Sequence, residues 1–252
     1  MKVSIITTCY NRAYTIKDAI ESVLNQDYPL IEYIIVDGAS TDETMEIVHQ
    51  YSNRITKIVS EQDRGMYEAI NKGIRMATGD IIGLMHSDDV FYNNQVISSI
   101  VAAFKRYNPD MIYGNGIFVD AKNHNRTVRN WISGKKRHKR FKLGWLPLHT
   151  TTYFKSEVLK KYGLYNETYQ IAADTEFLTR YMYKYKIKTH YLNQYIVKMK
   201  IGGASTDLKK AIIKWSEDIR VYRRYNLNPY IALPAKILLK TPQLITRKRL
   251  TE

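Results

Sequence analysis

Short apolar runs alternate with stretches of helical periodicity through the first half of this 252-residue chain. The apolar runs predict strands over residues 3–7, 31–36, 55–60 and 81–85. Apolar residues at three- and four-residue spacing predict helices over residues 16–24, 66–77 and 96–104. A further helical stretch follows the second strand and ends at Val48. Nearly continuous apolar strands that alternate with helices form a parallel sheet covered on both faces. We therefore predict an α/β fold.

Polar residues follow these strands, and ligands of parallel sheets bind at the C-terminal ends of the strands. These residues are Thr8, Asp37, Glu61 to Asp63, and Asp88 with Asp89. Adjacent carboxylates raise each other's pKa unless water or a positive charge stabilises them. A solvated loop or a helix cap would explain the Asp88–Asp89 pair alone, but acidic residues in three of four converging loops favour a bound cation.

Two glycine-rich phosphate-binding motifs are absent from the sequence. No G-x-G-x-x-G follows the first strand, and no G-x-x-x-x-G-K-[ST] occurs anywhere. A nucleotide bound at this edge would need a divalent cation between its phosphates and the carboxylates. Mg²⁺ and Mn²⁺ are the candidates, because both prefer oxygen ligands and often share them with substrate phosphates.

Several segments carry a resemblance to a known family. They read VSIITTCYNR, IIVDGASTDET, EQDRGMYEAINKGI, ATGDIIGLMHSDD and IAADTEFLTRY. In this order, over residues 1–205, they resemble the family 2 glycosyltransferases of the bacterial, non-processive type. The resemblance implies a GT-A fold: a Rossmann-like nucleotide-binding, mostly parallel sheet flanked by helices, here with a C-terminal helical extension. It divides the chain into a nucleotide-sugar-binding half (1–120), an acceptor-binding half (121–206) and a basic amphipathic tail (207–252).

The resemblance also implies roles for residues on the donor side. Thr8 and Asp37 would contact the nucleotide base, Asp37 through the ring N–H of a uracil-type base. Asp63 and Gly65 would lie near the base or the ribose. Asp88 would bind the ribose.

Further implied roles concern the metal and the acceptor. Asp89 would hold Mn²⁺ or Mg²⁺, and it would be the sole protein ligand because Ser87 stands where the family's D-x-D motif has its first carboxylate. Asp174 would be the catalytic base. His149 and the GGAST segment (202–206) match other landmarks of the family.

The reaction implied by the resemblance moves a sugar from a nucleotide diphosphate to a hydroxyl of a saccharide or a polyprenyl-diphosphate-linked acceptor in surface polysaccharide assembly. Negative charge accumulates on the leaving diphosphate, where a metal at Asp89 would stabilise it. The acceptor hydroxyl must lose a proton, which Asp174 on the opposite face would accept as general base. In-line displacement then inverts the configuration. The signature of processive synthases, Q-x-x-R-W, is missing, which favours a single addition.

Other functions fit parts of the sequence. A sequence pI near 9.6 would suit a nucleic-acid-binding protein, but no helix-turn-helix, zinc or RRM signature is present and the ligand edge is acidic. A catalytically inactive scaffold of a glycan-assembly complex would be favoured if Asp89 or Asp174 were replaced, and neither is. A nucleotidyltransferase shares the α/β layout and the metal but not the segments around Asp174 and residues 202–206.

Charge is distributed unevenly along the chain. Residues 1–120 carry a formal charge of −6 and residues 121–252 one of +21, which together give +15. A polyanionic partner for the second half is expected, and the 122–142 stretch would help to hold an acceptor diphosphate. A well-solvated basic surface is the alternative.

The tail combines the same basic character with apolar clusters. Residues 207–225 predict an amphipathic helix, and Pro234 and Pro242 are expected to interrupt the segment after residue 225. Such a tail either lies on an anionic membrane surface or packs its apolar face on the domain.

One cysteine, a short N-terminal apolar run and the lack of any span of about 20 apolar residues predict a cytoplasmic protein. We expect it at the inner face of the cell membrane, and its oligomeric state stays open.

Overall fold

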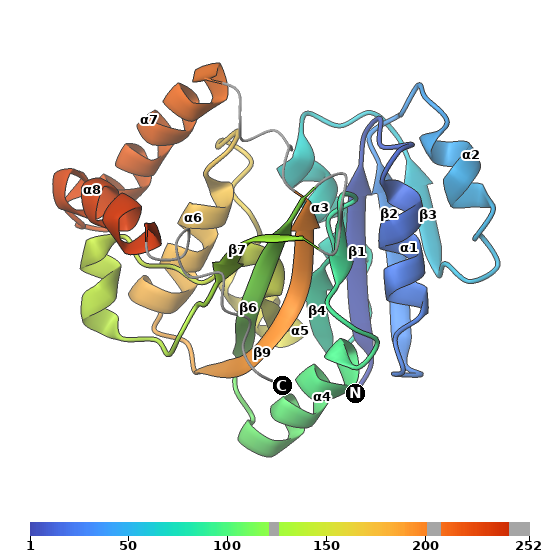
Figure 1. Ribbon diagram of the computed structural model, residues 1–252, viewed down its shortest axis with the longest axis horizontal. Coiled ribbons are helices and arrows are strands. Elements are labelled where there is room, and N and C mark those ends of the chain that lie inside the picture. The colour runs from blue at the N-terminus through green and yellow to red at the C-terminus, as the bar shows by residue number, and fades with distance from the viewer. Residues whose placement is uncertain (121–125, 201–207, 242–252) are drawn as a thin grey trace.

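The computed structural model describes residues 1–120, 126–200 and 208–241 (Figure 1). Its N-terminal elements are β1 (Val3–Cys9), α1 (Ile16–Leu24), β2 (Ile31–Asp37), α2 (Thr44–His49), β3 (Lys57–Ser60), α3 (Met66–Met76), β4 (Ile81–Leu84), β5 (Asp89–Phe91) and α4 (Val96–Tyr107). The later elements are β6 (Met111–Val119), β7 (Thr127–Trp131), η1 (His138–Leu143), η2 (His149–Thr151), β8 (Tyr153–Lys155), α5 (Ser156–Tyr162), α6 (Ala173–Thr179), η3 (Arg180–Lys184), β9 (Thr189–Lys200), α7 (Leu208–Arg224) and α8 (Pro229–Lys240).

Within the described residues, nine strands form one sheet in the order β3-β2-β1-β4-β8-β6-β9-β5, with β7 paired to β6. The four strands predicted from the apolar runs are parallel, as expected. β8 then runs antiparallel to both β4 and β6. The sequence did not predict β8, because a three-residue strand is too short to show a period. The sheet is therefore continuous between the donor-side and acceptor-side halves of the chain.

Helices cover both faces of the sheet, and the alternation of side chains along each strand explains why. On β2, Tyr33 and Ile35 pack with apolar residues of α1 and α4, whereas Ile34 and Val36 pack with those of α3. Strand residues that follow one another point to opposite faces, so an unbroken apolar strand must be buried on both. This arrangement confirms the predicted α/β class.

The helices α7 and α8 lie at the opposite end of the molecule from α2 (Figure 1). Val221 and Tyr222 of α7 and Ala232 of α8 are buried in the core cluster that also contains α3 and α6. Part of the tail is thus packed on the domain. None of the helices within the described residues has the length and apolar character needed to cross a bilayer.

The expected interruption at Pro234 is wrong, because α8 continues through this residue. Proline removes one backbone N–H and leaves the carbonyl of Tyr230, four residues earlier, without its helical partner. Tyr230 is exposed, so water can bond to that carbonyl. Pro242 and the 202–206 segment lie outside the described residues. Residue 121, which follows the first predicted domain boundary, and residues 206 and 207 at the second boundary also lie outside them.

Candidate active site

Thr8 and Asp37 lie near each other at the C-terminal edge of the sheet, because β1 and β2 pair in parallel. Thr8 is opposite Val36, and Cys9 is opposite Asp37. Thr8 is partly exposed, whereas Asp37 is fully buried. Burial, together with the charge of Asp37, raises the pKa of the Cys9 thiol well above its usual range. The two residues predicted to contact a base are therefore adjacent, and Cys9 stays a neutral, buried thiol beside them.

Both oxygens of the Asp37 carboxylate accept hydrogen bonds. The backbone N–H of Ser40 donates to Oδ2 at 2.9 Å, and the Ser60 hydroxyl donates to the same oxygen at 2.7 Å. The Ser40 hydroxyl donates to Oδ1. The N–H of Thr44, at the start of α2, donates instead to Asp42 at 3.0 Å. Helix capping therefore does not account for Asp37, which joins the ends of β2 and β3.

The loops that follow β1 and β2 are joined to each other by hydrogen bonds. The Asn11 N–H donates to the Ser40 hydroxyl at 2.8 Å, and the Thr41 N–H donates to Asn11 Oδ1 at 2.9 Å. Asn11 and Ala39 have φ angles of 51° and 62°. A left-handed alanine is costly, and such strain gathers at sites that must be held in one conformation. Hydrogen bonds within the chain thus fix the donor-side loops relative to each other.

Asp63 approaches Asp37 from the loop before α3. A Cβ atom on Gly38 would lie 2.9 Å from Asp63 Oδ2, so a larger residue there would displace the Asp63 carboxylate. The N–H of Gly65 donates to Asp63 Oδ1 at 2.9 Å, and Gly65 has a φ of 146°, which favours glycine. Burial raises the pKa of Asp63, and the charge of Asp37 adds to this effect. The structure therefore brings Asp37, Asp63 and Gly65 together.

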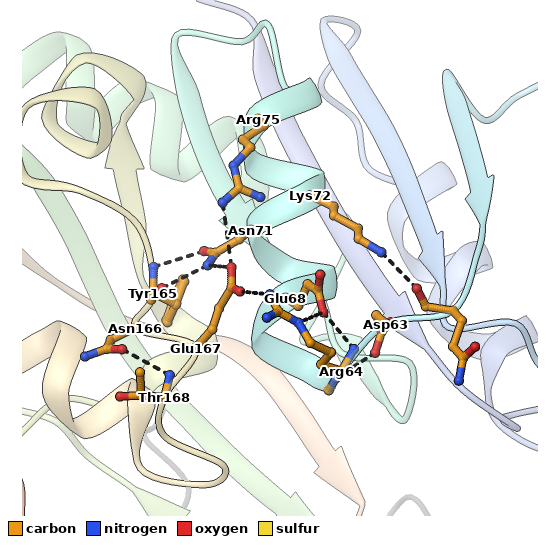
Figure 2. Close-up of polar contacts among 12 residues, drawn as sticks. Asp63, Arg64, Glu68, Asn71, Lys72, Arg75, Tyr165, Asn166, Glu167 and Thr168 are labelled. Carbon is orange, nitrogen blue, oxygen red and sulfur yellow. Dashed lines mark hydrogen bonds and ion pairs between the residues drawn. The ribbon is translucent and has the colours of Figure 1, made fainter.

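Polar contacts of α3 tie this loop to the segment that precedes α6 (Figure 2). The Arg64 guanidinium contacts Glu68 at 2.9 Å and Glu167 at 2.8 Å. The Asn71 side-chain amide donates to Glu167 at 2.8 Å and to the backbone carbonyl of Tyr165 at 2.9 Å. Exposed ion pairs such as those of Arg64 contribute little, so the buried Asn71 is the more important link. The donor-side and acceptor-side segments are thereby held in one arrangement.

Asp88 and Asp89 occupy different environments although they are neighbours in sequence. Asp88 lies in a turn after β4 and is partly exposed. Asp89 begins β5, is opposite Met199 of β9, and is only 3% exposed. Its Oδ2 atom is buried and has no hydrogen-bond partner among the described residues. Burial raises the pKa of Asp89 well above its usual range, the charge of Asp88 adds to this, and Lys200 opposes it.

A divalent cation fits the unpartnered oxygen of Asp89. A buried carboxylate without a donor is costly when it is ionised, and a cation would remove that cost. Within residues 1–120, 126–200 and 208–241 no group of three or more His, Cys, Asp or Glu side chains could hold a metal. Phosphate oxygens and water would therefore complete the coordination, as is usual for Mg²⁺ beside nucleotides. The donor set is consistent with a single protein ligand.

Two histidines, His86 and His149, lie close to each other, and the charge of Asp174 acts on the pKa of both. The rings of His86 and His149 are 6.1 Å apart, and Nε2 of His149 is 2.6 Å from the Tyr165 hydroxyl. Burial lowers the pKa of His86, and the charges of Asp88 and Asp174 offset this only in part. Burial also lowers the pKa of His149, to about 4. Both rings are neutral at neutral pH, and His149 is a buried, hydrogen-bonded histidine.

His86 was not among the residues selected from the sequence. Its position directly before Ser87 and the two carboxylates is a signal that could have identified it. Because it senses the charges of both Asp88 and Asp174, it marks the place where the donor edge and the acceptor side meet.

Asp174 lies in the first turn of α6 and is partly exposed. The N–H of Thr175 donates to its Oδ1 at 2.7 Å. Burial acts to raise the pKa of Asp174, but the nearby positive charges, of which Lys214 has the largest effect, hold it below its usual range. Since His149 is neutral, the effective cations are Lys214 of α7 and Lys236 of α8. Asp174 is therefore ionised at neutral pH, as a general base must be.

Glu217 of α7 fixes the backbone directly before α6. Its carboxylate accepts three consecutive N–H groups, from Gln170 at 2.8 Å, Ile171 at 2.9 Å and Ala172 at 2.8 Å. The Tyr67 hydroxyl of α3 donates to the Ile171 carbonyl at 2.7 Å. We name this set of contacts the Glu217 clamp. The sequence offered only a faint signal for it, an acidic pair within a basic helix.

Comparison with known proteins connects this geometry with a family. The family model described as Glycosyl transferase family 2 matches residues 4–163, which include the donor edge and His149. A PGL/p-HBAD biosynthesis glycosyltransferase of Mycobacterium tuberculosis is 26% identical over 210 residues, which cover 81% of this chain and 79% of that protein.

Solved structures show the same fold at low sequence identity. Staphylococcus aureus TarS (residues 1–349), in complex with UDP-GlcNAc, matches with a TM-score of 0.67 and 18% identity, over 88% of this chain and 65% of that one. The mannosyltransferase PcManGT of Pyrobaculum calidifontis, in complex with GDP-Man and Mn²⁺, matches with a TM-score of 0.66 and 17% identity. The second match covers 97% of this chain and 73% of that one.

Proposed function

The chain belongs to glycosyltransferase family 2, and we propose that it is an inverting, metal-dependent enzyme that uses a UDP-linked sugar. The acceptor is a hydroxyl of a saccharide or of a lipid-linked glycan in cell-surface polysaccharide assembly. One observation carries the proposal: the Oδ2 atom of Asp89 is buried at the donor edge and has no hydrogen-bond partner among the described residues. A divalent cation that shares its coordination with a nucleotide diphosphate fits such an oxygen.

The donor-side loops support nucleotide binding. Asp37 and Asp63 are held in fixed positions by hydrogen bonds and by the close approach at Gly38. In this proposal Thr8 and Asp37 contact the base, Asp63 and Gly65 lie near the base or ribose, and Asp88 binds the ribose. The nucleotides in the matched structures are uridine and guanosine diphosphates. The experiment below therefore compares sugars linked to different nucleotides.

Asp89 would hold Mn²⁺ or Mg²⁺ through its unpartnered oxygen. When bound, the cation would supply Lewis acidity that stabilises the leaving diphosphate. The Mn²⁺ in the matched mannosyltransferase structure is in keeping with this role. Asp89 itself would be ionised by the metal, although burial favours its protonated form in the free protein.

Asp174 would accept the proton of the acceptor hydroxyl as the new bond forms. Lys214 keeps this carboxylate ionised, and the Glu217 clamp fixes the backbone that leads into it. A base on the face opposite the leaving group gives in-line displacement and hence inversion. His149 would help only indirectly, because its ring is hydrogen-bonded to Tyr165.

The proposed acceptor is an anionic, lipid-linked saccharide. The name of the mycobacterial relative refers to PGL/p-HBAD biosynthesis, and the +21 charge of residues 121–252 suits an anionic acceptor such as a polyprenyl diphosphate. We place the enzyme in the cytoplasm, peripherally at the inner face of the cell membrane. A nucleic acid is a poorer partner, because the ligand edge of the sheet carries Asp37, Asp63, Asp88 and Asp89.

A thermal-shift panel tests this function. The protein is heated with UDP-, dTDP- and GDP-sugars, each with and without Mn²⁺. We expect one UDP-sugar to raise the melting temperature only when Mn²⁺ is present, after which product analysis establishes the anomeric configuration. A metal-independent shift, or a product with retained configuration, would contradict the proposal.

A further inference from the structure

Helix α8 exposes one apolar side, and its other side packs on the domain. Tyr230, Ile231, Pro234, Ile237 and Leu238 form one exposed side of the helix, which we name the α8 outer face. Tyr230 is 72% exposed and Leu238 is 71% exposed. These positions recur at helical spacing, so they form one stripe. The stripe faces away from the domain.

Contacts on the opposite side of α8 fix this orientation. Lys236 points inward and pairs with the buried Asp218 of α7 at 3.1 Å. Ala232 is fully buried, and its carbonyl oxygen would lie only 2.5 Å from a Cβ on Gly144, the residue after η1. The helix cannot roll to bury its apolar stripe without breaking the ion pair and this close approach. The contacts on the inward side of α8 therefore fix the exposure of the α8 outer face.

A basic groove lies beside α8. Its cavity of about 840 Å³ is lined by Gly134, Lys135, Arg137, His138, Lys139 and Arg140. The groove includes the first residues of η1, and η1 packs on α8 (Figure 1). Lys135, Arg137 and Lys139 are exposed. The apolar stripe and the cluster of cations thus belong to two elements, far apart in the sequence, that pack on each other.

We propose that the α8 outer face and the basic groove together bind an anionic lipid bilayer. Apolar side chains with a tyrosine among them enter the interfacial region, and lysines and arginines beside them bind anionic headgroups. Charge complementarity selects this occupant, because a second copy of the chain would bring another set of cations against the same groove. The inference rests on the proposed function in one respect: the surface gives the enzyme access to a lipid-linked acceptor.

Vesicle co-sedimentation at low salt tests the proposal with the full-length protein. One set of vesicles contains phosphatidylglycerol, and the other is pure phosphatidylcholine. We expect the protein to sediment with the first set only, and high salt to release it. The double variant Ile237→Ser/Leu238→Ser should lower binding by about tenfold or more, and Lys135→Glu/Arg137→Glu/Lys139→Glu should do the same.

Leu30→Ser is the matched control, because Leu30 is an exposed apolar residue directly before β2, 54% exposed. It should bind vesicles as the wild type does. All changed residues are exposed, and circular dichroism melting checks that each variant is folded. Wild-type protein that stays in solution with anionic vesicles would overturn the proposal, as would normal binding by the α8 double variant. Loss of self-association in that variant, without any vesicle binding by the wild type, would assign the face to a second copy. Vesicle binding does not require sugar transfer. The bilayer proposal and the proposed transferase function can therefore each be refuted without the other.

Discussion

The donor side and the acceptor side of the site each contain a carboxylate that is partly or fully buried. The pKa of the donor-side carboxylate is raised, whereas the pKa of the acceptor-side carboxylate is lowered. Burial of Asp89 disfavours its charged form, and its Oδ2 atom has no hydrogen-bond partner among the described residues. The pKa of Asp89 is therefore raised. Around Asp174 the charge of Lys214 outweighs burial, and the pKa is lowered. The acceptor side therefore contains its own cation, whereas the donor side needs one from elsewhere.

This difference separates binding from proton transfer. A site that requires an external cation is complete only when metal and nucleotide are present together. A base that is already ionised is ready before any substrate arrives. If the comparison is right, variants on the two sides should fail in different steps of the reaction.

The largest effect is expected for Asp174→Asn. The amide keeps the shape of the side chain but cannot accept the acceptor's proton, so kcat should fall by about 10²–10⁴-fold. Donor affinity, measured by titration calorimetry with the nucleotide sugar and Mn²⁺, should stay near the wild-type value. Normal transfer by this variant would assign the base to another residue.

Asp89→Asn should have the next largest effect, and it should act on the donor. The metal loses its only predicted protein ligand, so transfer should fall by about 10²–10³-fold. The Mn²⁺-dependent shift in melting temperature with UDP-sugar should disappear in the same variant. Asp174→Asn is the matched control, because it should keep that shift. Full activity of wild-type protein in EDTA would refute the metal assignment.

Lys214→Gln should change the pH dependence more than the maximum rate. Without this cation the pKa of Asp174 rises, so the base becomes protonated at a higher pH. The acid limb of the kcat profile should move to higher pH, with little change above neutrality. Lys105→Gln, an exposed lysine on α4, is the control. An unchanged acid limb would show that Lys214 does not act on the base.

The smallest effect is on stability. The raised pKa of Asp89 in the folded state means that its contribution to stability is present at low pH and is lost as pH rises through that value. At neutral pH without metal, Asp89→Asn should therefore raise the melting temperature by roughly 2–4 °C, as about 1 kcal/mol does in a domain of this size. The gain should vanish in acid, and a lower melting temperature at neutral pH would contradict the raised pKa.

The donor side could be predicted well from the sequence because its order is local. Each apolar run forms a strand, each strand ends in a polar loop, and the parallel pairing follows from the helices between the strands. Thr8, Asp37, Asp63 and Asp89 were all selected in this way before their spatial positions were known. Short-range periodicity was sufficient there.

The acceptor side depends on contacts between residues far apart in the chain, and no local pattern reports these. Glu217 and the loop it clamps are 45 to 47 residues apart. For the segment that forms α8, the sequence shows apolar clusters but not the direction in which they face. The ion pair with Asp218 and the close approach at Gly144 decide that direction.

The Glu217 clamp has a consequence for synthesis of the protein on the ribosome. The loops after β1 and β2 can form early, since they bond to one another, and β5, which begins with Asp89, completes its pairing once β9 has been made. The loop before Asp174 must wait for α7, because Glu217 is made 47 residues after Gln170. A nascent chain can therefore gain a nucleotide site well before it gains a finished base. Stalled ribosome complexes whose chains end before Leu208 should bind UDP-sugar with Mn²⁺ but should not transfer the sugar. An unfinished chain would therefore bind its donor without turnover.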